Sequence, residues 1–370
     1  GAPTLMQPNH PRSRRTFPLL GLLTSLILLA PSMMILHAQE AVTLDNASTP
    51  APNTPDEPLA DDLSLEKAAE FLDLASLSWQ KERKCGTCHT NYAYMMARPA
   101  LKSVIVEQHA VRQFFEEMVT QTWPEKGPRF DAEPVCAATA LAFHDSVTTG
   151  SLHETTKQAL TRMWSLQRED GGWDWLKCNW PPMESDDHYG VTLAALAVGV
   201  APDNYKNTEE AKSGMAKIRK YLETHPAETL HQRAMLLWAS LSFADLLSSE
   251  DQQSTLKELL ELQREDGGWA IATLGNWERS DGTPQDTTNS DGYGTGFVIY
   301  LARAMGVASS DSRIQRGIHW IKSHQRQSGR WFTRSLNKDS RHYISHTGTA
   351  FAIMALKACG EIPDSVAATP

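Results

Sequence analysis

The sequence predicts an all-α fold, an α/α toroid of roughly five to six helical hairpins with an inner and an outer ring of helices. Two observations lead to this prediction. A loop of nearly constant sequence recurs along the chain, and two kinds of helical segment alternate around it. One kind carries a single apolar stripe and the other is apolar on nearly all sides, while no segment has a convincing strand pattern.

The recurring loop reads QREDGGW at Gln167–Trp173 and again at Gln263–Trp269, and a looser copy, QRQSGRW, covers Gln325–Trp331. Each copy follows residues with helical spacing, such as Leu160 and Met163 before the first. We expect the glycine of each loop to stop the preceding helix, because glycine adopts the left-handed cap conformation without strain. The tryptophan can then fold back between neighbouring helices.

A second kind of segment follows each loop. Gly190–Val200, Gly294–Gly306 and Gly348–Gly360 are apolar and rich in small residues, which is typical of a helix buried on all sides. By contrast, Glu209–Glu223 is polar with one apolar stripe. An inner ring of buried helices inside an outer ring of amphipathic helices is the simplest arrangement that buries both kinds.

The Gln-x-x-x-Gly-x-Trp loops resemble the QW motifs of squalene–hopene cyclases and related terpenoid cyclases. That superfamily shares its α/α toroid with protein prenyltransferase β subunits. The resemblance covers about residues 63–362, which we take as one toroid domain, followed by a tail over residues 363–370. It implies that the Gln and Trp of each loop tie outer helices together and are structural residues.

The N-terminal part predicts export. A basic start is followed by the apolar run Phe17–Leu36 and by Ala38, which is the order of a secretory signal, here residues 1–38 with cleavage near Ala38. The alternative is a transmembrane anchor, so a membrane is expected only if the segment stays uncleaved. Residues 39–62, rich in Pro, Ala, Thr and Asp, read as a flexible linker. We therefore expect a periplasmic or secreted protein.

Composition excludes some classes. The net charge of −9 argues against nucleic acid as a partner. The chain of 370 residues has five cysteines, of which only Cys85 and Cys88 are close in sequence, so it is not a disulfide-dense scaffold.

The sequence KCGTCH holds the most specific motif, Cys85-x-x-Cys88-His89, which is the attachment signature of c-type haem. The two thiols would form thioethers with the haem vinyl groups, and His89 would ligate the iron. This attachment takes place outside the cytoplasm, which agrees with the predicted export. The motif lies in the first repeat, because Gln80–Gly86 follows its helix as the other loops follow theirs.

The other side of the iron has several candidates. The second axial ligand could be Met95 or Met96, a more distant histidine such as His109, or nothing. Two other interpretations of the motif stay open, a Cys85–Cys88 disulfide and a metal site. Zinc is not expected, because the chain has no second Cys-x-x-Cys.

A polar cluster opens each buried helix. Because inner helices of a ring run parallel, Asp186, Asp187, Asp291 and His346 are expected to converge at one end of the central cavity as a candidate catalytic group. The alternative is that these aspartates cap their helices, since their oxygens accept the free N–H groups there.

The resemblance refines this site. SDGYG and SHTGT resemble the zinc-binding segments of prenyltransferase β subunits, with Asp291 and His346 at ligand positions, but Tyr293 stands where the family has cysteine. ESDD, residues 184–187, resembles the acid motif of the cyclases, in which paired carboxylates supply a proton to an alkene. The cyclases have two helical domains, whereas this chain is long enough for one.

The sequence therefore leaves three alternative functions open. The first is an exported haem protein that acts in electron transfer with a redox partner protein or binds an apolar, isoprenoid-like small molecule. The second is an isoprenoid cyclase or prenyltransferase-like enzyme that uses the Asp/His group. The third is a non-catalytic interaction module with a structural disulfide.

Overall fold

The computed structural model describes residues 41–86, 89–107, 109–340 and 343–364. Within these ranges the chain is helical and contains no strand, which confirms the all-α class. None of the helices in this part is long and apolar enough to cross a membrane. The predicted signal segment, residues 1–38, and residues 365–370 of the tail lie outside the described residues.

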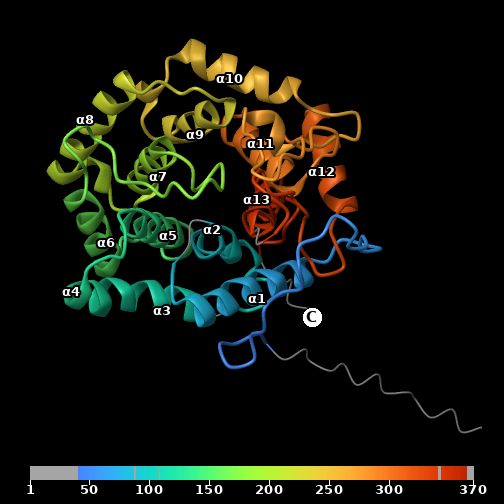
Figure 1. The fold of residues 1–370 in the computed structure, drawn as a ribbon, viewed down its shortest axis with the longest axis horizontal. Helices are drawn as coiled ribbons and strands as arrows, with labels where there is room; N and C mark the ends of the chain where they lie inside the picture. The colour runs from blue at the N-terminus through green and yellow to red at the C-terminus, as the bar shows by residue number, and fades with distance from the viewer. Residues whose placement is uncertain (1–40, 87–88, 108, 341–342, 365–370) are drawn as a thin grey trace, which may run out of the picture. The chain divides into compact units, whose positions relative to one another are not determined.

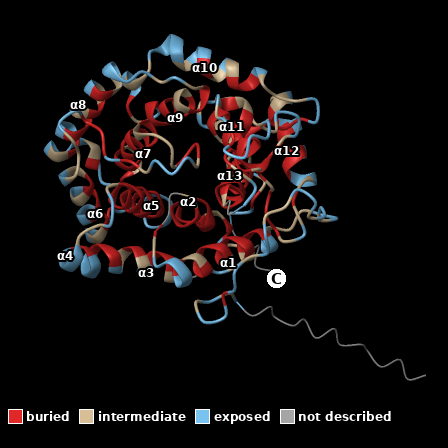
Figure 2. Ribbon diagram, in the orientation of Figure 1, coloured by how far each residue is buried: buried red, intermediate tan, exposed pale blue. Residues whose placement is uncertain are grey.

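Among the described residues, seven of the helices lie on the outside, and Figure 1 shows their arrangement. Their inward residues are buried and their other faces are exposed, as Figure 2 shows. They are α1 (Leu65–Arg83), α3 (Ala110–Glu117), α4 (Trp123–Lys126), α6 (Glu154–Ser165), α8 (Glu209–Thr224), α10 (Ser249–Glu261) and α12 (Ser312–Ser323). The buried positions of α8 include Ala211, Met215 and Ile218, which are the stripe that the sequence predicts.

Six helices lie inside them and are buried over most of their length (Figures 1 and 2). They are α2 (Asn91–Ala97), α5 (Ala132–Thr148), α7 (Asp187–Val200), α9 (Leu230–Ser240), α11 (Gly292–Ala304) and α13 (Ile344–Ala358). Each packs against the next in this order, and α13 also packs against α2. Short helical turns lie along the chain between some of these outer and inner helices. They are η1 (Arg98–Leu101), the π-helical η2 (Met118–Thr122), η3 (Tyr205–Asn207), η4 (Ala244–Leu246) and η5 (Ile271–Leu274).

The glutamine of each recurring loop links two outer helices. Its side-chain nitrogen donates to a carbonyl in its own loop and to a carbonyl of the next outer helix or its cap. Gln167 donates to Gly214 of α8, Gln263 to Arg313 of α12, and Gln325 to Ser64, the N-cap of α1, at 3.0, 2.7 and 2.8 Å. The tie that joins outer helices therefore also connects the last of them to the first.

The tryptophans fold back as the sequence suggests. Trp173, Trp269 and Trp331 are fully buried, and each indole N–H donates to a carbonyl ten residues earlier in the preceding outer helix, at 2.7–2.8 Å. A large apolar ring is thereby placed between the outer and inner helices with its polar atom satisfied.

The loop glycines have a different role from the predicted helix cap. The helices before the loops end at Ser165, Glu261 and Ser323, ahead of the glutamine. The left-handed residues are Gly171, Gly267 and Gly329, further along, with φ of 95°, 93° and 93°. A Cβ on Gly171 would lie 2.0 Å from the carbonyl oxygen of Lys217, and one on Gly329 would lie 2.1 Å from that of Lys67. Glycine is required because the loop touches the backbone of the next outer helix.

The first repeat departs from the others in one respect and agrees in another. Helix α1 continues through Gln80 and ends at Arg83. The next residue, Lys84, caps the helix in a left-handed conformation with φ 49°. Even so, Gln80 Nε2 donates to the carbonyl of Ala110, the first residue of the next outer helix, at 3.4 Å. The aligned glutamine thus reaches the same kind of partner from within a helix.

The described residues of the proline-rich segment before α1 pack against the third loop. Arg330 donates to the carbonyl of Ala51, Gln327 N donates to that of Pro58, and Glu57 pairs with Arg330 at 3.2 Å. Arg330, which is buried, and Arg326, which is partly buried, both donate to carbonyl groups of the segment, and the flexible linker stays a prediction from composition. The arrangement places residues 49–54 in the wall of a cavity that α1 also lines.

Candidate functional site

The cysteine loop joins α1 to α2. Lys84 turns the chain out of α1, Gly86 is buried against Phe115 of α3, and α2 begins after Thr90. Cys85 is partly buried, and burial raises the pKa of its thiol. Cys88 lies outside the described residues, so the structure places two of the three predicted haem-attaching residues, Cys85 and His89.

His89 is held from its Nδ1 side. Its Nδ1 lies 2.7 Å from Thr90 Oγ1, which in turn lies 2.8 Å from Nδ1 of His346 on α13. Burial lowers the pKa of His89 to about 3, so the imidazole is neutral. No described residue forms a hydrogen bond with Nε2. A neutral imidazole fixed at one nitrogen is the form in which histidine binds metals.

Two aromatic rings surround the imidazole. Tyr343 stacks on His89 with ring centroids 5.1 Å apart, and Trp79 meets His89 edge-on at 4.6 Å. Trp79 and Tyr343 also contact each other, at 4.8 Å. The orientation of the ring is therefore determined by packing as well as by the hydrogen bond.

His89 lines a cavity of about 390 Å³. Its other walls come from α1, from the turn before α7 and from the start of α13; they include Trp79, Trp180, Met183 and Tyr343. This volume falls in the range of small-molecule and cofactor sites, about 300–1,000 Å³. The indole Nε1 of Trp79 is buried and has no hydrogen-bond partner among the described residues.

Two cations stand at the walls of this cavity. The guanidinium carbon of Arg83 lies 5.4 Å from the ring centroid of Trp79, and Lys338 Nζ lies 5.7 Å from that of Trp180. Both residues line the cavity, Arg83 from the end of α1 and Lys338 from the loop before α13. The lining thus combines aromatic faces, a neutral imidazole, two cations and the carboxyl group of Glu184.

A second cavity, of about 310 Å³, lies on the other side of Trp79 and Tyr343, which line both. His346 lines this second cavity, and residues 49–54 form part of its wall. The Thr90 hydroxyl therefore connects a histidine of one cavity to a histidine of the other.

The two aspartates at the start of α7 serve local roles. Asp186 caps the helix by accepting from Tyr189 N at 3.2 Å. Asp187 pairs with Arg168 at 2.9 Å and with Lys177 at 3.4 Å. Asp187 is therefore occupied by two cations rather than paired with a second carboxyl group.

Asp291 caps α11. Its Oδ1 accepts from Gly294 N at 2.7 Å and its Oδ2 accepts from Ile271 N at 2.8 Å. Burial raises the pKa of Asp291 to about 7. Tyr293, which stands where the predicted resemblance would have a cysteine, has its hydroxyl 2.9 Å from Nε2 of His231. Within the described ranges, no three His, Cys, Asp or Glu side chains form a group that could hold a metal ion.

The four predicted catalytic residues therefore lie at helix N-termini, where each has its own local partners. Thr333 links the starts of α11 and α13, since its hydroxyl accepts from Tyr293 N and its backbone N–H donates to Ser345 Oγ. His346, however, is engaged with Thr90, and Asp187 is engaged with Arg168.

Aromatic rings pack between the inner helices behind these N-termini. Tyr293, Phe297 and Phe351 contact one another, and Trp238 contacts Phe297 and Phe351. The pocket lined by Asp186, His188 and His231 has a volume of about 10 Å³. That is room for a water molecule and not for an isoprenoid chain.

The predicted methionine ligands lie elsewhere. Met95 and Met96 are buried in α2 within the hydrophobic core, and neither lines the His89 cavity. His109 is exposed at the N-cap of α3. The methionine that does line the cavity is Met183, which sequence reasoning missed. Its position in the sequence WPPM, where two prolines set a turn before the helix, is the signal that could have singled it out.

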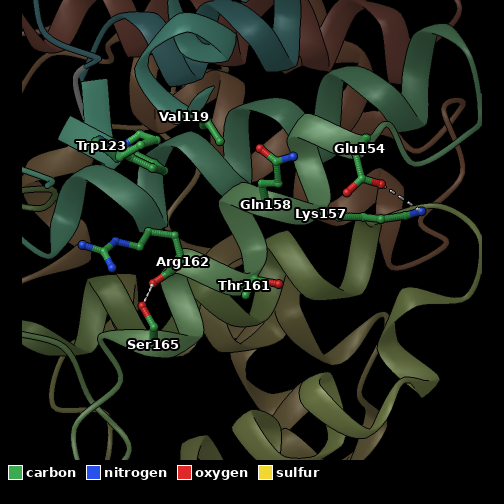
Figure 3. Close-up of a pocket in the computed structure, with 9 residues that line it drawn as sticks. Val119, Trp123, Glu154, Lys157, Gln158, Thr161, Arg162 and Ser165 are labelled. Carbon is green, nitrogen blue, oxygen red and sulfur yellow. Dashed lines mark hydrogen bonds and ion pairs between the residues drawn. The ribbon is translucent and has the colours of Figure 1, made fainter. Parts of the chain in front are cut away.

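A further cavity, of about 440 Å³, lies on the outside between η2, α4 and α6 (Figure 3). It is lined by Trp123, Glu154, Lys157 and their neighbours, and includes none of the predicted site residues. The site that sequence and structure share is therefore the His89 cavity.

No protein-family model matches the chain, and no curated protein sequence matches it at a significant level. The likeness to terpenoid cyclases thus stays a prediction carried by the recurring loops.

Proposed function

We propose that this chain is an exported c-type haem protein that acts in electron transfer. The observation that carries the proposal is the setting of His89. Its neutral imidazole follows Cys85-x-x-Cys88 directly, is fixed through Nδ1, and lines an aromatic cavity of cofactor size.

We also propose that the helices form an α/α toroid of the terpenoid-cyclase type. Support comes from the successive packing of the inner helices, from the contact of α13 with α2, and from the bond of Gln325 to Ser64. In this proposal the toroid serves as a rigid frame, and the cysteine loop replaces the Gly-Gly-Trp corner of the first hairpin.

The residues that line the cavity would suit a haem, and Cys85 lies close to His89 in the chain but outside that lining. Cys85 and Cys88 would attach the haem covalently, and His89 Nε2 is the ring nitrogen left for iron. Trp79, Trp180 and Tyr343 offer apolar faces, while Arg83 and Lys338 can neutralise its carboxylates. A haem iron supplies one-electron transfer when bound, and these side chains would orient the group and exclude water from it.

The enzyme alternative has less support. Alkene protonation or prenyl transfer needs a cavity behind the Asp/His N-termini, where aromatic side chains and a pocket of about 10 Å³ are found. The carboxylates that would act there are engaged in helix caps and ion pairs. The second candidate function is a non-catalytic interaction module, in which Cys85 and Cys88 would form a disulfide instead of binding haem.

A haem stain tests the proposal. The chain with its own N-terminal segment is produced in a bacterial host that carries a c-type haem maturation system, and is run on a denaturing gel. We expect staining of the wild type, loss or strong reduction in Cys88→Ala, and no change in Cys178→Ala, which removes an exposed cysteine outside the motif.

Intact mass separates the alternatives. Attachment adds the mass of one haem, whereas a disulfide removes the mass of two hydrogen atoms. An unstained wild type that lacks these hydrogens would overturn the haem proposal and support the disulfide.

A further inference from the structure

We propose that Met183 would supply the second protein ligand to the iron of the proposed haem, with His89 as the first. The inference rests on the proposed haem and names the residue that completes its coordination. It also predicts a protein whose iron has no open position for small ligands.

Met183 is presented to the cavity by a tight turn. Glu184 N donates to the carbonyl of Trp180 at 3.0 Å, and Trp175 Nε1 donates to the carbonyl of Met183 at 2.7 Å. Although it lies in a loop, Met183 is 4% exposed, and it lines the same cavity as His89. The backbone on both sides of its side chain is therefore held in place.

Thr347 of α13 ties the two proposed ligands together. Its hydroxyl donates to the carbonyl oxygen of His89 at 2.6 Å and lies 3.5 Å from Sδ of Met183. A hydroxyl has one proton, and the shorter contact takes it. The sulfur is thus located beside the His89 backbone while its lone pairs are left available to a metal.

Other donors near the cavity are poorer ligands. His346 uses Nδ1 toward Thr90 and lines the other cavity. Lys338 lines the His89 cavity, but an ammonium group has no lone pair to give. Met95 and Met96 belong to the core beneath α2. A thioether is also the ligand that, with histidine, raises the reduction potential of a c-type haem.

The test uses the holoprotein and the absorption band that a methionine sulfur gives with ferric haem at the red end of the spectrum. We expect the band in the wild type, its loss in Met183→Leu, and its retention in Met95→Leu. Leucine has nearly the volume of methionine, so folding is expected to survive. The ferrous Met183→Leu protein should bind carbon monoxide, which the wild type should not.

A second variant guards against misfolding. Met183→His keeps two axial ligands, so it should lack the sulfur band, stay closed to carbon monoxide and have a lower reduction potential than the wild type. A stained wild type without the band, or a band that persists in Met183→Leu, would overturn the Met183 assignment and leave the haem proposal standing. An unstained wild type would instead remove the haem proposal itself.

Discussion

The side-chain amide of Gln325 bonds to both backbone polar groups of Ser64. Its Oε1 accepts from Ser64 N at 2.7 Å, and its Nε2 donates to Ser64 O at 2.8 Å. The two residues are 261 positions apart, and Ser64 also caps α1 by accepting from Lys67 N. One side chain after the last outer helix therefore fixes the start of the first.

Replacing Gln325 by Ala should loosen this connection. The variant loses the two bonds to Ser64 and the bond to Gly329, all at a buried position, so we expect a loss of about 2–4 kcal/mol of unfolding free energy. Urea denaturation measures the loss. Hydrogen exchange should rise in the first turn of α1.

Gln263→Ala is the matched control, because it removes the same kind of bonds between α10 and α12. It should lower stability without faster exchange in α1. Equal exchange of α1 in both variants would contradict a specific role for Gln325.

Gly329→Ala tests why glycine stands in the loop. The new Cβ would lie 2.1 Å from the carbonyl oxygen of Lys67, so the loop and α1 must separate. Gly306→Ala is the control, since Gly306 has nearly the same φ, 91° against 93°, and nothing within 4 Å of its Cβ. We expect about 1–2 kcal/mol for Gly306→Ala from backbone strain and a clearly larger loss for Gly329→Ala. If backbone strain alone determined the loss of stability, thermal unfolding would give the same loss for Gly329→Ala and Gly306→Ala.

Asp73 holds α2 in place beneath the cysteine loop. It accepts from Arg98 Nε at 2.8 Å and from the Tyr94 hydroxyl at 2.9 Å, and all three side chains are buried. Asp73→Asn leaves the Arg98 cation buried without its counter-charge, so we expect a loss of about 3–5 kcal/mol.

The exposed pair Glu209–Lys212 gives the comparison for Asp73→Asn. Glu209→Gln should change stability by less than about 1 kcal/mol, because both partners are hydrated. Similar urea midpoints for Asp73→Asn and Glu209→Gln would show that burial of the pair is unimportant.

Local sequence patterns were enough to predict several of the helices, but not α2, α3 or α4. The apolar stripe of α8 and the buried composition of α7, α11 and α13 follow from periodicity, which depends on neighbours in the chain. The recurrence of Gln and Trp likewise predicted structural residues, and the hydrogen bonds of Trp173, Trp269 and Trp331 agree.

Contacts between distant residues were not predictable in this way. The motif singled out His89, but its links to His346 through Thr90, and to Met183 through Thr347, join positions far apart in the sequence. Met95 and Met96 follow the motif closely in the sequence, yet α2 places both side chains in the hydrophobic core. Sequence patterns also could not show why glycine stands in the loops. The reason is that each loop lies against the backbone of the next outer helix.

Asp291 should make stability depend on pH near neutrality. Burial raises the pKa of this carboxyl from 3.8 to about 7 in the folded chain, so the folded state holds the proton more tightly than the unfolded state. The stability that the protonated form contributes is complete below pH 4 and is lost as the pH rises through 7. Linkage gives about 1.4 kcal/mol for each pH unit in this window.

Asp291→Asn removes this titration. Urea unfolding at pH 5 and pH 8 should show the stability of the wild type relative to Asp291→Asn falling by roughly 3 kcal/mol at the higher pH. The control is Asp311→Asn. Asp311 caps α12, and its hydrogen bond with Arg313 lowers its pKa to about 2, so its contribution is constant from pH 5 to pH 8. A difference between wild type and Asp291→Asn that is the same at both pH values would mean that Asp291 is charged throughout, with its two backbone N–H donors outweighing its burial.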